Sequence, residues 1–230
     1  MSECPRFKPL GDAALVVEFC EEISLDVNHL VHALARLVTR DQLTGVKECV
    51  PTYCSLLIHY DPLQLNYRQI HDWLADRVGA LESFPVALPH YVEIPTVYGG
   101  EFGPDLEYVA HHNHLSVEDV IRIHSSGEYL VYMMGFTPGF GYMGGVAETI
   151  ATPRLEAPRP LVRAGSVGIA GQQTGIYPID SPGGWRLIGY TPRRFFDVVR
   201  EPPFLLVPGD VVRFIPVPKF ELNHFVIESH

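Results

Sequence analysis

The 230-residue sequence is acidic, with 17 lysine and arginine residues against 27 aspartate and glutamate residues and a formal net charge of −10. Such a surface repels phosphodiester backbones, and no run of basic residues compensates locally, so the sequence predicts no nucleic-acid interface. With 47% hydrophobic and 19% charged residues, the composition is that of a compact folded protein. No apolar run reaches the ~18 residues that would span a membrane, and the first ten residues carry charges where a secretory signal is apolar. We therefore expect a cytoplasmic protein without a membrane segment.

The first part of the chain alternates β-prone and helical patterns. In both predicted helices the apolar residues recur at three- and four-residue intervals, which places them on one face. The order β-α-β-β-α-β predicts a ferredoxin-like, split βαβ unit. Its elements are a β-prone run over 13–19, a helix from Ser24 to Arg40, strands over 46–50 and 53–60 separated at Pro51, a helix over 67–81 and a strand over 91–97.

The second part has one clear helix and otherwise short apolar runs. Ser116 is the predicted N-cap of that helix and Gly127 its end. Beyond it, apolar runs alternate with turn residues, which is typical of a β barrel or sandwich. Residues 135–189 hold 12 of the chain's 20 glycines, which predicts tight turns and close backbone approach there. We expect an α+β protein with an α/β domain over 1–88, a hinge at 83–89 and a mainly β domain over 89–230.

Cysteine and histidine patterns predict no metal site. The four cysteines lie in the first quarter of the chain without a CxxC pair, so we expect buried free thiols. His111, His112 and His114 are too close together on an irregular segment to converge on one ion, so we expect them at the surface. His124 lies in the last turn of the predicted helix, where the helix dipole would favour its protonated form. Either a proton-transfer role or a structural hydrogen bond is compatible with that place.

Two glycine motifs resemble known signatures without meeting their structural context. Residues 139–144 match GxGxxG, but the prolines at 153, 158 and 160 are incompatible with the long helix that a dinucleotide loop opens. Residues 164–168 differ by one residue from GxSxG, but a predicted strand follows where a nucleophile elbow needs a helix. We expect neither a dinucleotide-binding protein nor a serine hydrolase.

Arginine or backbone amides must hold any anion bound by the second part, because no lysine lies between residues 90 and 218. Four arginines lie in or beside the glycine-rich region, and their neighbouring turns favour Arg154 and Arg159 over Arg163 and Arg186 as anion-binding residues. Aromatic residues flank the same turns. Most are expected in the core, whereas Trp185 follows two glycines and is expected to line a pocket.

Long stretches of the second part resemble one known family. Residues 128–142, with Gly135-Phe136-Thr137-Pro138-Gly139-Phe140-Gly141-Tyr142, are similar to the GFxPGFxY signature of the family of 5-oxoprolinase B subunits, also called allophanate hydrolase subunit 1. Residues 164–178 and 181–189 resemble two further signatures, and 98–106 is a weaker match. The family usually has proline where Arg163 stands, so no family role is carried onto Arg163, whereas Arg159 matches the pattern. Gly141 replaces a commonly bulkier residue.

The resemblance implies a small N-terminal α/β domain and a C-terminal cyclophilin-like β barrel. It also implies a function as the B subunit of a 5-oxoprolinase, which opens 5-oxo-L-proline to L-glutamate with ATP. The A subunit and the related cyclophilin-like C subunit would be its partners. Two alternatives stay open: a non-enzymatic inhibitor of a sensor histidine kinase, and part of an allophanate or urea amidolyase-type hydrolase. We expect the chain alone to be inactive, because it has no Walker lysine and no acidic metal pair.

A hypothesis for the site follows from the resemblance and the residue types. ATP would be shared with the partner subunits, and arginine side chains and glycine turns would hold the charges of a small amide substrate. The candidate catalytic residues are His124, Arg159, Gln173 and Tyr177. The candidate substrate-binding residues are Phe136, Pro138, Gly139, Phe140, Arg154, Gly165, Ser166 and Trp185.

Overall fold

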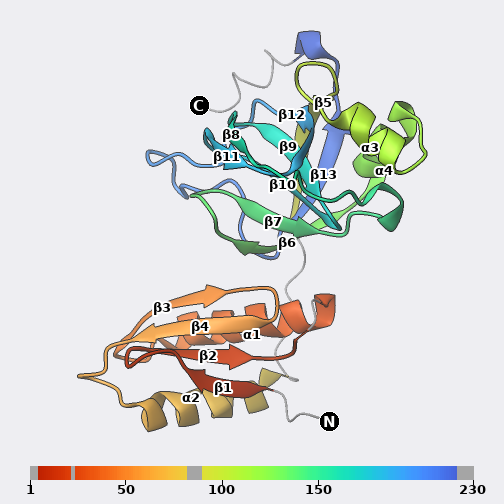
Figure 1. Cartoon of the computed structure of the whole chain (residues 1–230). Helices are drawn as coiled ribbons and strands as arrows, with labels where there is room; N and C mark the ends of the chain where they lie inside the picture. Colours follow the sequence, from red (N-terminus) through yellow and green to blue (C-terminus); the bar gives the residue numbers. More distant parts are fainter. Residues whose placement is uncertain (1–4, 22–23, 82–89, 222–230) are drawn as a thin grey trace. The chain divides into compact units, whose positions relative to one another are not determined.

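The chain folds into two compact units, with the division between residues 88 and 89. The computed structural model describes residues 5–21, 24–81 and 90–221 (Figure 1), and the predicted hinge at 83–89 lies outside them. None of the helices in these ranges has the length and apolar character needed to cross a membrane.

The first unit is a four-stranded antiparallel sheet with two helices. Its order along the sheet is β1-β2-β4-β3. The helices pack Leu34 and Leu74 against Leu15 and Ile58 of the central strands. The elements are β1 (Arg6–Pro9), β2 (Ala14–Glu18), α1 (Leu25–Asp41), β3 (Val46–Pro51), β4 (Ser55–Tyr60) and α2 (Tyr67–Gly79).

Side chains at the helix starts explain where both helices begin. The Ser24 side chain accepts a hydrogen bond from the Val27 N–H, so the predicted N-cap of α1 is confirmed. Asn66 and Gln69 form a reciprocal capping box at the start of α2. Cys20, Cys49 and Cys54 are not joined by disulfide bonds, and they are only partly buried, so the prediction of buried thiols is wrong for these three.

The sheet has the ferredoxin-like strand order, but the prediction of its edge strand was wrong. The N-terminal strand β1 pairs antiparallel with β2 and takes the place assigned to residues 91–97. A short hairpin makes this pairing local, with Gly11 at φ +66° and a hydrogen bond from the Leu10 N–H to the Ala14 carbonyl. Residues 91–98 instead form β5, in which four consecutive residues are buried. A half-exposed edge strand would alternate, so this pattern belongs to a strand covered on both faces.

The second unit is a closed seven-stranded barrel with the order β10-β7-β6-β13-β5-β12-β9. This confirms the expected α+β class with a barrel. The barrel strands are β5 (Tyr91–Tyr98), β6 (Tyr129–Met134), β7 (Gly141–Gly144), β9 (Ser166–Ala170), β10 (Gln173–Ile176), β12 (Arg186–Tyr190) and β13 (Val211–Pro216). A separate two-stranded ribbon consists of β8 (Arg159–Val162) and β11 (Ser181–Gly183).

Two helices pack against the barrel core, and Figure 1 shows them side by side. α4 (Val117–Ser126) begins after Ser116, whose side chain accepts from the Asp119 N–H, as predicted. α3 (Leu106–His112) was missed: it has seven residues and no side-chain cap, so it leaves little local signal. His111 and His112 therefore lie on a helix, not on an irregular segment. Two short 3₁₀ turns, η2 (Glu148–Ile150) and η3 (Lys219–Glu221), complete the described elements.

Glycines in the barrel wall let a second, smaller core form outside the barrel. This cluster contains Phe140, Val162, Ala170, Tyr177, Trp185 and Leu187. A Cβ on Gly175 would lie 3.0 Å from both Phe140 Cζ and Trp185 Cζ3, and one on Gly168 would lie 3.1 Å from Trp185 Cβ. The sequence predicted that other groups approach the backbone closely in the glycine-rich segment. In the structure these groups are aromatic side chains, which pack directly on the backbone of the glycines.

Candidate functional site

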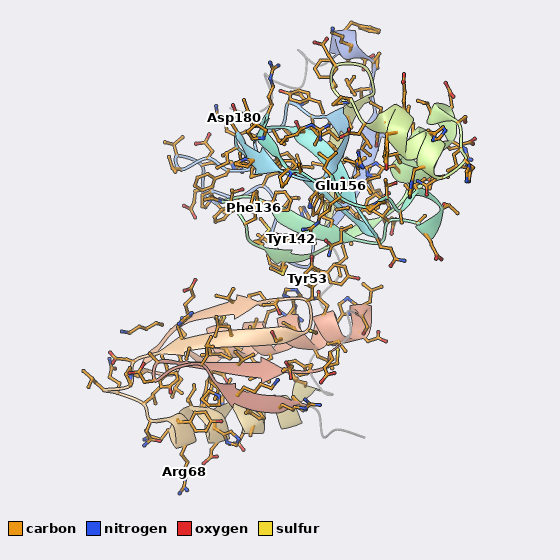
Figure 2. The ribbon with its side chains drawn as sticks, in the orientation of Figure 1. Tyr53, Arg68, Phe136, Tyr142, Glu156 and Asp180 are labelled. Carbon is orange, nitrogen blue, oxygen red and sulfur yellow. The ribbon has the colours of Figure 1, made fainter. Side chains whose placement is uncertain are left out.

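A cavity of about 310 Å³ opens beside this aromatic layer. We call it the aromatic cavity. Five of the predicted site residues line it, namely Phe136, Phe140, Arg154, Tyr177 and Trp185. Its remaining lining residues are Tyr142, Leu155, Pro158, Pro182, Gly183 and Gly184. Figure 2 labels two of the lining residues on the barrel unit, Phe136 in the turn after β6 and Tyr142 in β7.

Phe140 is the centre of the cavity's packing. Its ring meets those of Tyr177 and Trp185 edge to face, each at 5.5 Å between centroids. Phe140, Tyr177 and Trp185 are all buried, whereas Phe136 is 57% exposed. Edge-to-face pairs add about 0.5–1.5 kcal/mol each beyond their buried area. Three walls of the cavity are therefore rigid, and Phe136 forms an exposed rim.

The Phe136 rim is held in an unfavourable backbone conformation. Phe136 has φ +63°, in the left-handed region that a bulky side chain rarely adopts. Such strain costs on the order of 1–3 kcal/mol and concentrates at functional sites. Pro138 and Gly139 shape this turn and do not line the cavity: Gly139 has φ +87°, and a Cβ there would lie 2.9 Å from Phe196 Cβ. The turn thus presents Phe136 at a fixed position.

The Tyr177 hydroxyl stays protonated at neutral pH. Burial raises its pKa, opposed in part by a hydrogen bond from the Trp185 backbone and by the charges of Arg154 and Arg159. A protonated phenol has a hydroxyl that can donate to a ligand.

Arg154 is the cationic group of the aromatic cavity. Its guanidinium carbon lies 5.8 Å from the centroid of the Trp185 ring. Among the residues that the structure describes, no carboxylate forms an ion pair with it. A guanidinium beside aromatic walls is suited to an anionic group on a ligand that also has an apolar ring face.

Arg159, by contrast, is held by a carboxylate. Its Nη2 donates to Asp105 Oδ1 at 2.8 Å and its Nη1 to the Trp185 carbonyl at 3.4 Å. The other Asp105 oxygen accepts from the Leu187 N–H at 2.7 Å, and Asp105 is only 7% exposed. Asp105 neutralises Arg159 and ties the start of α3 to β8 and β12. Arg159 therefore positions the backbone around Trp185.

Arg159 and Ser166 line a different hollow from Arg154. This second hollow, of about 780 Å³, is here called the Arg163 groove. It is lined by Glu101, Phe102, Pro104, Arg159, Leu161, Val162, Arg163, Ala164, Ser166, Asp180, Leu187, Tyr190 and Pro192. The two arginines favoured by the sequence as anion-binding residues thus line two different hollows, and Arg159 contacts the backbone of Trp185, which lines the aromatic cavity.

His124 is part of the barrel core and lines neither hollow. Burial lowers its pKa to about 3, opposite to the direction expected from the helix dipole. The Tyr98 hydroxyl donates to Nδ1 at 2.7 Å, and the Thr174 hydroxyl donates to the Gly168 carbonyl at 3.0 Å. Thr174 Oγ1 must then accept from His124 Nε2–H, at 3.0 Å. The imidazole is a neutral, structural link, because both ring nitrogens are bonded within the fully buried core.

Gln173 and Gly165 also lie outside the aromatic cavity. Gln173 begins β10, opposite Gly144 of β7 and Ala170 of β9, and lines neither hollow. Gly165 has φ +86°, and a Cβ there would lie 2.2 Å from the Thr191 carbonyl oxygen. Gly165 is required by backbone packing, and Ser166 is a buried residue at the floor of the Arg163 groove.

Comparison with known proteins identifies the family. The family described as "Carboxyltransferase domain, subdomain C and D" matches residues 5–206. The chain belongs to this family. A relative from Bacillus subtilis, named as the B subunit of 5-oxoprolinase, is 44% identical over 98% of this chain and 98% of its own length. A urea amidolyase from Lachancea kluyveri is 26% identical over 95% of this chain, which corresponds to only 14% of that protein.

A solved structure supports the same relationship. The protein designated TTHA0988 superposes with a TM-score of 0.79 and 40% identity over 89% of this chain, and this match is 40% of the TTHA0988 chain. This chain therefore corresponds to two fifths of the longer TTHA0988 chain.

Asp105, which holds Arg159 beside the aromatic cavity, was not predicted from the sequence as a site residue. The only signal was its place in the weaker resemblance over residues 98–106, after Gly103 and Pro104. The approach of this turn to β12 is a tertiary feature: a Cβ on Gly103 would lie 2.1 Å from the Ile188 carbonyl oxygen. Within residues 5–21, 24–81 and 90–221, no three histidine, cysteine or acidic side chains gather as a metal site would require.

Proposed function

We propose that this chain is the B subunit of a cytoplasmic, ATP-dependent 5-oxoprolinase that acts with the A and C subunits to convert 5-oxo-L-proline to L-glutamate. The name and 44% identity of the Bacillus subtilis relative, which matches along almost its whole length, support the proposal. The observation in the structure that carries it is the guanidinium of Arg154, which lines an aromatic cavity of about 310 Å³ and has no carboxylate partner among the described residues.

The aromatic cavity matches the chemistry of this substrate. 5-Oxoproline is a small five-membered lactam with one carboxylate. In the proposal the ring packs against Phe140 and Trp185, the carboxylate pairs with Arg154, and the Tyr177 hydroxyl donates to the lactam oxygen. The exposed rim residue Phe136 covers the ring and excludes water. The aromatic side chains belong to rigid, packed segments, which favours orientation of the substrate.

ATP supplies the activation that a stable lactam needs, by phosphorylating its oxygen and giving water a better electrophile. In this chain, the Tyr177 hydroxyl and Arg154 would hold the lactam oxygen and the carboxylate while the partner subunits present ATP. No GxxxxGK[ST] loop is present in the sequence. We therefore propose that the chain has no turnover by itself and contributes the substrate-binding cavity.

The test is ATP-dependent glutamate release from 5-oxoproline by the chain alone and by the three subunits together. We expect release only from the complete mixture. Arg154→Ala should raise KM at least about tenfold, because the carboxylate loses a charged partner. Arg122→Ala, which removes an exposed arginine paired with Asp119 on α4, is the matched control and should leave KM unchanged. No glutamate from the complete mixture would contradict the proposed function.

A urea amidolyase-type activity is the second candidate, favoured by the 26% identity to the Lachancea kluyveri protein over 95% of this chain. The same mixture offered allophanate or urea distinguishes the two. Ammonia release from allophanate without glutamate release from 5-oxoproline would favour this candidate.

A further inference from the structure

The aromatic cavity is lined by a second phenol, Tyr142, which belongs to β7. Its neighbour Met143 is fully buried in the barrel core, whereas Tyr142 is half-buried and packs against the aromatic cluster outside the barrel. Successive side chains of a strand point to opposite faces, so β7 directs Met143 into the barrel and Tyr142 towards the cavity. Tyr142 therefore adds a hydroxyl group to the cavity wall.

Two ring contacts hold the Tyr142 side chain in place. The centroid of its ring lies 4.9 Å from that of Phe140, with 66° between the planes. The centroid of Trp185 lies 6.2 Å away, with 61° between the planes. Both are edge-to-face contacts, which restrict the position of the ring. The hydroxyl is thus fixed before a ligand enters, as the recognition of a single ligand atom requires.

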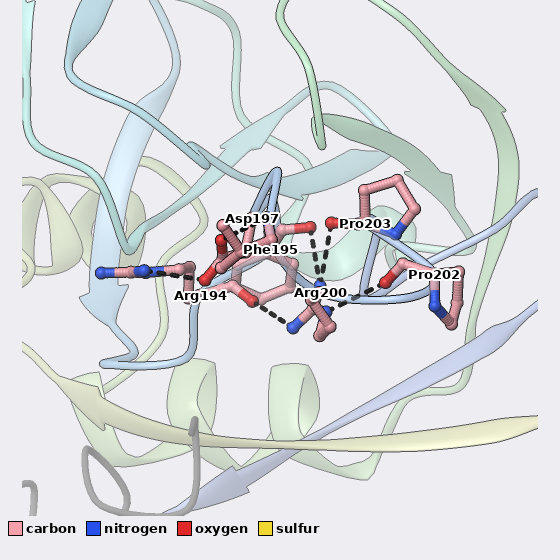
Figure 3. Close-up of polar contacts among 7 residues, drawn as sticks. Arg194, Phe195, Asp197, Arg200, Pro202 and Pro203 are labelled. Carbon is pink, nitrogen blue, oxygen red and sulfur yellow. Dashed lines mark hydrogen bonds and ion pairs between the residues drawn. The ribbon is translucent and has the colours of Figure 1, made fainter.

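The turn that precedes Tyr142 is supported by the loop at residues 194–204. A Cβ on Gly139 of this turn would lie 2.9 Å from Phe196 Cβ, so turn and loop are in direct contact. Within the loop, the guanidinium of Arg200 donates to four backbone carbonyl oxygens (Figure 3). The chain that enters β7 therefore rests on a segment with strong internal bonds.

Side chains that can accept a hydrogen bond are scarce in the aromatic cavity. Arg154 and the indole of Trp185 can only donate, and apart from the two tyrosines the other lining side chains have no polar atom. The phenol oxygens of Tyr142 and Tyr177 are thus the side-chain acceptors among the lining residues that the structure describes. Tyr177 already bonds to the backbone of Trp185. An N–H group of a ligand therefore depends on Tyr142 for a side-chain acceptor.

A lactam presents a donor and an acceptor on the same edge. The amide of a five-membered ring is cis, so its C=O and N–H point to one side, whereas an open-chain amide is trans and presents them on opposite sides. Two neighbouring hydroxyls match the cis edge. Tyr142 and Tyr177 both pack edge to face on Phe140, and a charge on Tyr142 would raise the pKa of Tyr177, so the two phenols lie within electrostatic reach of each other.

We propose that Tyr142 makes the cavity specific for cyclic amides with an N–H group, because its phenol oxygen accepts the lactam N–H while the Tyr177 hydroxyl donates to the lactam oxygen. A phenol oxygen can accept in this way while its own hydrogen is bonded elsewhere. The inference rests on the proposed function, since it names the substrate class of the same cavity. A lactone of the same shape has an oxygen in place of the N–H, so it would oppose one acceptor to another.

The test measures Kd for 5-oxo-L-proline and for the corresponding lactone, in which an oxygen replaces the ring N–H. Every protein carries Trp73→Phe, so that the cavity residue Trp185 is the single tryptophan and its fluorescence reports binding. This parent protein should bind the lactam at least about tenfold more tightly than the lactone. Tyr142→Phe removes one oxygen atom and keeps the ring. It should weaken lactam binding about tenfold and leave lactone binding unchanged.

Two matched variants separate this role from a general effect on the cavity. Tyr177→Phe should weaken binding of the lactam and the lactone by similar factors, because both ligands have the carbonyl oxygen to which Tyr177 donates. Tyr108→Phe, at a tyrosine of α3 that is 43% exposed and does not line the cavity, should change neither Kd. Urea unfolding should show the same midpoint for Tyr142→Phe and the parent. The lactam preference of the parent protein tests the same contact without any change at Tyr142.

The outcomes separate the role of Tyr142 from the proposed function. Equal binding of lactam and lactone by the parent, no binding of either, or an equal loss for both in folded Tyr142→Phe overturns the role of Tyr142. A lactam preference that depends on Tyr142, without glutamate release from the complete mixture, leaves that role standing and removes the proposed function. Glutamate release together with an unchanged preference in Tyr142→Phe does the reverse.

Discussion

Acidification should destabilise the second unit through His124. Its pKa falls from 6.5 in the unfolded chain to about 3 in the fold, because the imidazole is fully buried. Between these two pKa values, His124 is protonated in the unfolded state and neutral in the folded state. The contribution of His124 to the free energy of unfolding is fully present above pH 6.5. It is lost progressively as the pH falls from 6.5 towards 3.

The size of this effect follows from the two pKa values. Each pH unit below 6.5 costs about 1.4 kcal/mol until the folded pKa is reached. Between pH 7 and pH 5 the loss from this one group is about 2 kcal/mol, a substantial part of the ~5–15 kcal/mol that holds a typical domain together.

The assay compares urea unfolding of the wild type and His124→Gln at pH 7 and pH 5. Glutamine can accept from Tyr98 and donate to Thr174 without titrating. Trp73→Phe in both proteins leaves Trp185 as the single tryptophan, so fluorescence reports the second unit alone. We expect the wild type to lose about 2 kcal/mol more than His124→Gln over this interval. Equal losses would refute the buried, neutral imidazole.

Three further substitutions test the packing around the aromatic cavity. Phe140→Ala should lower the free energy of unfolding by about 3–5 kcal/mol, because it removes the central ring; a loss below about 1 kcal/mol in urea titration would contradict that role. Gly175→Ala should cost about 1–3 kcal/mol by pushing Phe140 and Trp185 off the barrel wall, and unchanged Trp185 fluorescence would argue against it. Asp105→Ala should cost roughly 1–3 kcal/mol by leaving Arg159 and the Leu187 N–H without their acceptor, whereas Glu107→Ala, in the first turn of α3, should be neutral. Similar melting temperatures for Asp105→Ala and Glu107→Ala would contradict a stabilising role for the Asp105–Arg159 ion pair.

Local sequence signals predicted the elements whose ends are chemically marked. Ser24 and Ser116 begin their helices as expected, because a cap bond involves residues only three positions apart. The aromatic cavity was partly predictable for a similar reason. Phe136, Phe140, Tyr177 and Trp185 flank glycine turns, and glycine marks places where other groups approach the backbone.

Some predicted site residues do not line the aromatic cavity, because contacts between residues far apart in the chain decide their roles. The neutralisation of Arg159 depends on Asp105, which is 54 residues away in the chain. The low pKa of His124 depends on burial against Tyr129 and Phe214, which nothing in the local helix pattern indicates. The dipole of a ten-residue helix favours the cation by a small amount, and complete desolvation outweighs it.

The sequence by itself determined the class of fold, the two helices with serine caps, and the segment where aromatic rings meet glycine. Tertiary structure decided which strand completes the first sheet and which arginine a buried carboxylate neutralises. The physical reason is that capping and periodicity are set by near neighbours along the chain. Strand partners, burial and ion pairing are set by residues that only the folded chain brings together.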